Sequence, residues 1–80
     1  MIRQKRPALV LTFDATAQAL AAETLFAQRG LPGRMIPVPA QISAGCGLAW
    51  KAEPGDRQAL LDALAQAGQA CSQCAVVEMF

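Results

Sequence analysis

The sequence contains no histidine. Catalytic sites that pair a cysteine or serine nucleophile with an imidazole base are therefore excluded, as are metal sites with a histidine ligand. Charge is also scarce and balanced, because seven basic and six acidic residues give a formal net charge of +1. Proteins that bind nucleic acid typically carry a clustered basic excess, so we expect no nucleic-acid partner.

Long apolar runs are missing as well. No stretch approaches the roughly 20 apolar residues that span a bilayer, and the run after the basic start is shorter than the core of a signal peptide. We expect residues 1–7 to be a flexible basic leader and residues 8–80 to form one domain, in the cytoplasm and away from membranes. The chain is 54% hydrophobic, so its stability would rest on apolar burial.

The cysteine count is odd, at three, whereas a disulfide scaffold uses an even number. We therefore expect reduced thiols unless they do redox or metal chemistry. Cys46 lies between Gly45 and Gly47, which have no side chains to cover it and give the backbone unusual freedom. This pattern predicts an accessible, reactive thiol. A small buried structural cysteine is the alternative that the local sequence leaves open.

Glycine and proline divide the chain into six elements. We expect strands at 8–13, 34–38, 47–51 and 74–80, with residues 9, 11 and 13 on one face of the first. A first helix would be capped by Asp14 or Thr16, run to about Arg29 and end at Gly30. A second would begin within 53–56 and end at Gly68. The apolar face predicted for the first helix comprises Ala17, Leu20, Ala21, Leu25 and Gln28.

The order β-α-β-β-α-β predicts an α+β, ferredoxin-like sandwich. Its four-stranded antiparallel sheet would carry both helices on one face, with the second strand at an edge because Pro37 cannot donate to a ladder. The other face would need a cover, and we expect a homodimer through it.

This topology would bring all three cysteines to one edge of the domain, beside the N-terminus of the first helix. A helix N-terminus carries partial positive charge and stabilises a thiolate, which favours a reactive Cys46. Cys71 and Cys74 form a C-x-x-C pair, but they precede a strand, unlike the redox motif that follows one. A zinc site would be one ligand short. Incidental thiols, or thiols that resolve what Cys46 carries, are the remaining interpretations.

The residues also carry a family resemblance. It begins at residues 11–13 (LTF), continues through 30–32 (GLP) and 34–39 (RMIPVP), and is most specific at 42–49 (ISAGCGLA). In these motifs, over residues 8 to about 68, the sequence resembles the selenium/sulfur carrier protein-like family of small bacterial proteins. The Cys71/Cys74 pair lies outside the resemblance.

The resemblance implies a carrier rather than a turnover enzyme. Cys46 would hold sulfur or selenium as a persulfide or selenopersulfide. From the residues themselves, we expect Ser43, Gly45 and Gly47 to contact the cargo, and Cys71 and Cys74 are candidate resolving thiols. The partners would be donor and acceptor proteins, and no cofactor or resident metal is expected. The alternatives are a small-ligand or protein-binding regulatory module and a metal chaperone that uses the three cysteines.

Overall fold

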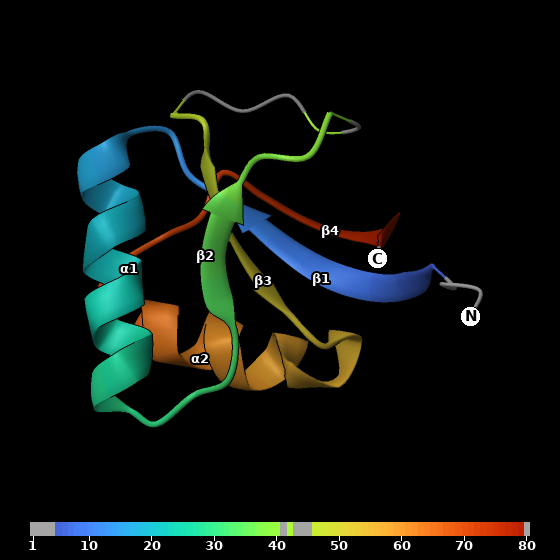
Figure 1. Ribbon diagram of the computed structural model, residues 1–80. Coiled ribbons are helices and arrows are strands. Elements are labelled where there is room, and N and C mark those ends of the chain that lie inside the picture. Colours follow the sequence, from blue (N-terminus) through green and yellow to red (C-terminus); the bar gives the residue numbers. More distant parts are fainter. Residues whose placement is uncertain (1–4, 41, 43–45, 80) are drawn as a thin grey trace.

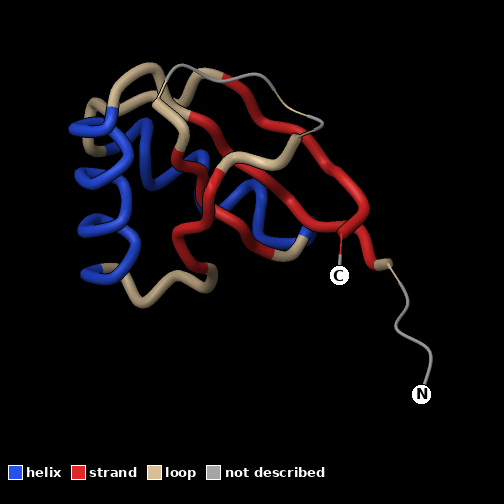
Figure 2. Tube along the Cα trace, turned by 45° about the horizontal axis from the view of Figure 1, so that its top comes forward, coloured by secondary structure: helices blue, strands red, loops and turns tan. Residues whose placement is uncertain are grey.

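Strand β1 (Arg6–Thr12), which is buried over its last five residues, lies inside the sheet with a neighbour on each side. The structure is a computed structural model that describes residues 5–40, 42 and 46–79. Two helices pack on one face of a four-stranded sheet (Figures 1 and 2). The other elements, in chain order, are α1 (Thr16–Gln28), β2 (Arg34–Pro37), β3 (Leu48–Ala52), the 3₁₀ turn η1 (Pro54–Asp56), α2 (Arg57–Gln66) and β4 (Gln73–Met79).

The strand order is β2-β3-β1-β4, and every neighbouring pair is antiparallel. The predicted α+β fold of ferredoxin-like topology is confirmed, as is the place of β2 at a sheet edge. The strands differ from the prediction by one or two residues at their ends, and β1 begins at Arg6 rather than at residue 8. No helix in the described part of the chain has the length and apolar character needed to span a bilayer.

The core lies between the sheet and the helices. Leu9, Leu11 and Phe13 point into it together, as predicted from their alternation. The opposite face of β1 is also shielded in the single chain, because Ala8, Val10 and Thr12 are at most 5% exposed. A central strand that is buried on both faces needs apolar residues at successive positions, and the run from 8 to 11 supplies them.

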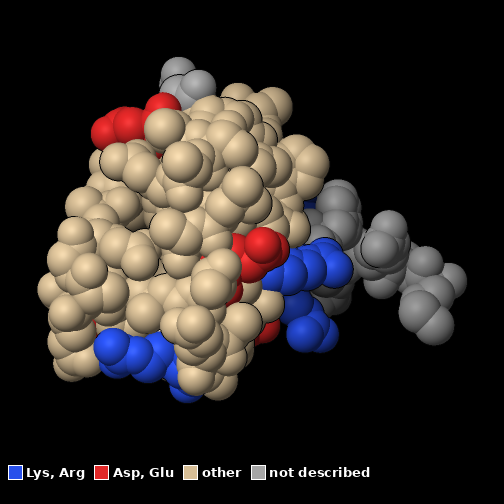
Figure 3. All heavy atoms as spheres, turned by 90° about the vertical axis from the view of Figure 1, so that its left-hand side faces the viewer, with Lys and Arg blue, Asp and Glu red and all other residues tan. Residues whose placement is uncertain are grey.

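The predicted apolar face of α1 is wrong except at Leu25. Its buried residues are Ala19, Ala22, Leu25 and Phe26, whereas Leu20 is 49% exposed. Apolar side chains surround this alanine-rich helix, so periodicity alone could not select the buried face. Figure 3, which views the molecule from the α1 side, accordingly shows a largely uncharged surface.

The prediction for the N-terminal end of α1 is wrong, whereas the prediction for its C-terminal end is confirmed. Neither Asp14 nor Thr16 caps the helix, because the N-cap is Ala15 and no side chain bonds the helix amides there. Instead the Oε1 atom of Gln18 accepts hydrogen bonds from the Asp14 and Ala15 amides, at 3.1 and 3.2 Å. The C-terminal end follows the prediction, since Gly30 adopts a φ of +66° and the Leu31 amide donates to the Phe26 carbonyl at 2.9 Å.

Trp50 ties β2 and its preceding turn to the core. Its indole ring packs on Phe26, with ring centroids 5.0 Å apart, and its Nε1 donates to the Pro32 carbonyl at 3.2 Å. Gly33 lies against this ring with a φ of +123°, in the left-handed region that favours glycine. A Cβ at this position would overlap the indole and lie 2.6 Å from the Lys51 carbonyl oxygen.

Gly33→Ala is therefore expected to lower the free energy of unfolding by about 2–4 kcal/mol, from backbone strain plus overpacking. Urea denaturation measures the change. Gly55→Ala is the matched control, because a Cβ there meets nothing within 4 Å and the backbone φ is not positive. The control should stay within about 0.5 kcal/mol of the unmodified protein. Equal losses in both variants would contradict the assigned role of Gly33.

Candidate functional site

Cys46 lies where the β2–β3 connection enters β3, two residues before that strand begins. Gly47 makes this entry with a φ of +79°, a conformation in which a side chain would be strained. Its carbonyl accepts a hydrogen bond from the Val38 amide at 3.0 Å, so the two ends of the connection are joined. Gly47 thus has a structural reason to be glycine. Ser43 and Gly45, the other predicted substrate contacts, lie outside the described residues.

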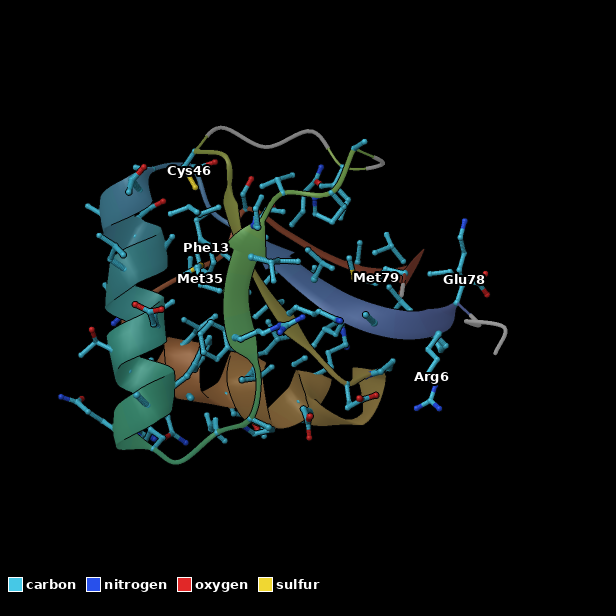
Figure 4. The ribbon with its side chains drawn as sticks, in the orientation of Figure 1. Arg6, Phe13, Met35, Cys46, Glu78 and Met79 are labelled. Carbon is cyan, nitrogen blue, oxygen red and sulfur yellow. The ribbon has the colours of Figure 1, made fainter. Side chains whose placement is uncertain are left out.

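The sulfur of Cys46 is held by the backbone of Leu48. The Leu48 amide donates to Sγ at 3.4 Å, and the thiol donates to the Leu48 carbonyl at 3.3 Å. The residue is partly buried and packs against the core cluster that contains Phe13. Figure 4 shows its sulfur directed inward, near the N-terminal end of α1. Cys46 is therefore neither a fully buried core residue nor a thiol at a bare loop tip.

Thr12 fastens the start of β4 to the same edge of the sheet. Its carbonyl accepts from the Ser72 amide at 2.6 Å, and its Oγ1 accepts from the Gln73 amide at 3.0 Å. Thr12 is also opposite Ala49 of β3 and is fully buried. The end of β1, the start of β3 and the start of β4 consequently meet there, as predicted. Sequence reasoning missed Thr12, although a lone hydroxyl at the end of an apolar strand was the available signal.

Cys71 and Cys74 lie in and beside this junction. Cys74 is opposite Leu11 in the β1–β4 ladder, and both cysteines pack partly buried against the core cluster. All three cysteines are free thiols. In the described ranges 5–40, 42 and 46–79, no group of three or more metal-ligating side chains could hold a metal ion. Among the described residues, the cysteines therefore share an edge without forming a three-ligand centre.

The pKa of Cys71 is raised above its ordinary value. Burial is the main cause, since it penalises the thiolate, and the neighbouring Cys74 raises the pKa further because two negative charges would repel. A backbone hydrogen bond and the positive charge of Arg57 act in the opposite direction without reversing the shift. Cys71 therefore keeps its proton to higher pH than an exposed thiol, which lowers its nucleophilicity near neutral pH.

Comparison with known proteins finds a family whose sequence pattern covers this edge of the sheet. The model of the family described as "Putative Se/S carrier protein-like" matches residues 8–75. That span includes Cys46 and extends beyond the predicted limit at about residue 68, so Cys71 and Cys74 lie inside the match rather than outside it. Neither the curated proteins nor the solved structures gave a match.

The raised pKa predicts the pH profile of Cys71 alkylation. Because the thiolate is the reacting form, the pH at which iodoacetamide labelling of Cys71 is half-maximal should be higher than for an ordinary exposed cysteine. Cys74→Ser removes one cause of the shift and should move the profile to lower pH. Peptide mass spectrometry measures labelling at each cysteine separately. Ser72→Ala is the matched control and should leave the profile unchanged. The same profile with and without the Cys74 thiol would contradict the assigned coupling.

Proposed function

The chain belongs to the Se/S carrier protein-like family, and we propose that it carries sulfur or selenium on Cys46 as a persulfide or selenopersulfide. The observation that supports this most is the setting of the Cys46 sulfur. It is partly accessible, and it accepts a hydrogen bond from the Leu48 amide. A backbone amide that points at a sulfur stabilises negative charge there, whether on a thiolate or on a persulfide anion.

Loading of Cys46 is a thiol exchange at sulfur. The Cys46 thiolate attacks the terminal sulfur of a donor persulfide, the donor's sulfur–sulfur bond breaks, and the donor leaves as a thiolate. The new bond makes Cys46 a persulfide with no net oxidation or reduction. A donor selenopersulfide reacts in the same way at selenium. Delivery repeats the step, with an acceptor thiolate attacking the terminal atom and Cys46 leaving as a thiolate.

The neighbouring residues have separate roles in this proposal. Gly47 supplies the turn that directs Cys46 toward Leu48, and Ser43 and Gly45 contact the cargo. Of the two resolving thiols, Cys71 is the weaker candidate, because its raised pKa leaves it mostly protonated near neutral pH. Donor and acceptor proteins in a bacterial cytoplasm complete the proposal.

Intact-mass spectrometry after incubation with glutathione persulfide tests the carrier role. The reduced protein should gain the mass of one sulfur atom, and Cys46→Ser should lose most of that gain. Cys71→Ser and Cys74→Ser are matched controls that should still load. Glutathione selenopersulfide, in a second arm, should add one selenium atom at the same residue. If Cys46→Ser loads as fully as the unmodified protein, Cys46 is not the carrier.

We also propose that the carrier forms a homodimer, through the outer edge of β4. The dimer expected from the sequence would form through the sheet face away from the helices. On that face, however, Val10 and Ala49 are already fully buried in the single chain. β4 is a seven-residue edge strand without proline, and its central residue Val76 is 53% exposed. Such an edge pairs readily with another strand. A second copy would meet it in antiparallel fashion about Val76, whereas β2, the other edge, is short and contains Pro37.

Val76→Lys is expected to shift the protein to monomer, because a charged side chain in the middle of an edge strand opposes pairing. Size-exclusion chromatography with light scattering measures the mass. Leu20→Lys is the matched control, since Leu20 is a similarly exposed apolar residue (49%) on α1, and it should leave the dimer intact. A monomeric unmodified protein at about 100 μM, a concentration well above typical dissociation constants of stable dimers, would contradict the proposal.

A further inference from the structure

A second candidate site lies at the opposite end of the sheet from Cys46. A hollow of about 450 Å³ opens there, where β1 begins and β3 and β4 end. Three cationic side chains line it, Arg6, Arg34 and Lys51, and we call it the basic hollow. Figure 4 shows Arg6 and Met79 at this end of the molecule, far from Cys46. Small-molecule sites in proteins typically measure about 300–1,000 Å³, so the hollow has the size of one.

The strand register brings the three cations to one face of the sheet. Arg34 of β2 is directly opposite Lys51 of β3, and Lys51 is opposite Val10 of β1. Because the intervening residues Leu11 and Trp50 point into the helical core, these positions point away from it. Arg6 has the same parity as Val10 along β1 and shares that face. Residues on three adjacent strands therefore place positive charge on one face of the sheet, and all three line the hollow.

The cross-strand pair of Arg34 and Lys51 destabilises the sheet when no anion is bound between them. Like charges directly opposite each other on neighbouring strands destabilise a sheet. Within the described residues, none of the three cations forms an ion pair that would relieve this repulsion. Places where a sequence breaks a local stability rule without internal compensation are typical of functional sites.

The acidic residues of the hollow narrow the class of ligand. Glu53 and Asp56 also line it, just before the start of α2. Three cations and two carboxylates leave a local charge of only +1, which suits a small anion and disfavours a polyanion such as nucleic acid. Figure 3 shows charged atoms of both signs together on one flank of the molecule. Guanidinium groups recognise phosphate and carboxylate oxygens in a bidentate manner.

We propose that the basic hollow binds a small molecule through one oxyanion group, a phosphate or a carboxylate, held by Arg6, Arg34 and Lys51. The anion would supply the negative charge that the sheet itself does not place beside Arg34 and Lys51. Gly33 also lines the hollow. This site is independent of sulfur or selenium loading at Cys46, because it lies at the other end of β1.

Amide chemical-shift titration tests the proposal with two probes, inorganic phosphate and acetate, at constant ionic strength set by sodium chloride. Saturable shifts should appear at residues 6–8, 33–36 and 51–53 with at least one probe. The probe that saturates identifies the phosphate or the carboxylate as the preferred group. Shifts that grow linearly with both probes, or that are spread over the surface, would overturn the proposal.

Arg34→Glu separates binding from folding. It should raise the Kd of the probe that saturates at least about tenfold, the effect of losing one charge-assisted contact. It should also raise Tm, because the introduced carboxylate would face Lys51 as an opposite charge. Arg29→Glu is the matched control, since Arg29 is exposed at the end of α1 and bonds Gln66 outside the hollow. It should leave binding unchanged.

Two results with these variants would overturn the proposal. One is equal weakening by Arg29→Glu, which would assign binding to net charge alone. The other is a fall in Tm for Arg34→Glu, which would show that Arg34 stabilises the sheet rather than serving a ligand. Lys51→Gln provides a second, milder removal of charge from the same hollow, and it should also weaken the saturating probe.

Discussion

The pairing of β1 on both of its edges is the constraint on which the structure depends. Its backbone groups bond β3 on one side and β4 on the other, and its side chains are buried on both faces from Ala8 to Thr12. A one-residue slip would exchange the two faces and move Leu9 and Leu11 out of the helical core. The register of β1 therefore fixes which residues of its neighbours share a face. The thiols at one end and the cations at the other are both placed in this way.

Much of the fold followed from the sequence because its signals are local. The apolar runs, Gly30 and Gly68 as helix stops, and Pro37 as an edge marker each report on a few neighbouring residues, and their order was sufficient for the ferredoxin-like topology. The buried face of α1 could not be obtained in this way. An alanine-rich helix presents apolar surface in every direction, so the choice of Phe26 over Leu20 was made by Trp50 across the core. That is a tertiary interaction with no local signal.

In the candidate site, too, the features with local sequence signals could be predicted and those that depend on tertiary contacts could not. The position of Cys46 and its glycine neighbour followed from the sequence, because a cysteine between glycines at a strand entry has a local meaning. The hydrogen bonds to Leu48 and the attachment of β4 through Thr12 required coordinates. Thr12 meets Gln73 across 61 residues of chain, and no composition or spacing could specify that bond. The effect of the α1 N-terminus on Cys46 stays a prediction.

The basic hollow could not be predicted from the sequence for a related reason. The repulsion between its cations lowers the stability of the sheet, and this loss calls for an explanation. Neither Arg34 nor Lys51 is unusual by itself, and only the β2–β3 register places the two cations directly opposite each other. Cross-strand pairs are worth about 0.2–1 kcal/mol, whereas whole domains are stable by only about 5–15 kcal/mol. An 80-residue chain has a limited core with which to offset such a loss. A single exchange of Arg34 for an acidic residue would turn the repulsion into attraction, so the presence of two opposed cations is best explained by a ligand that supplies the missing anion.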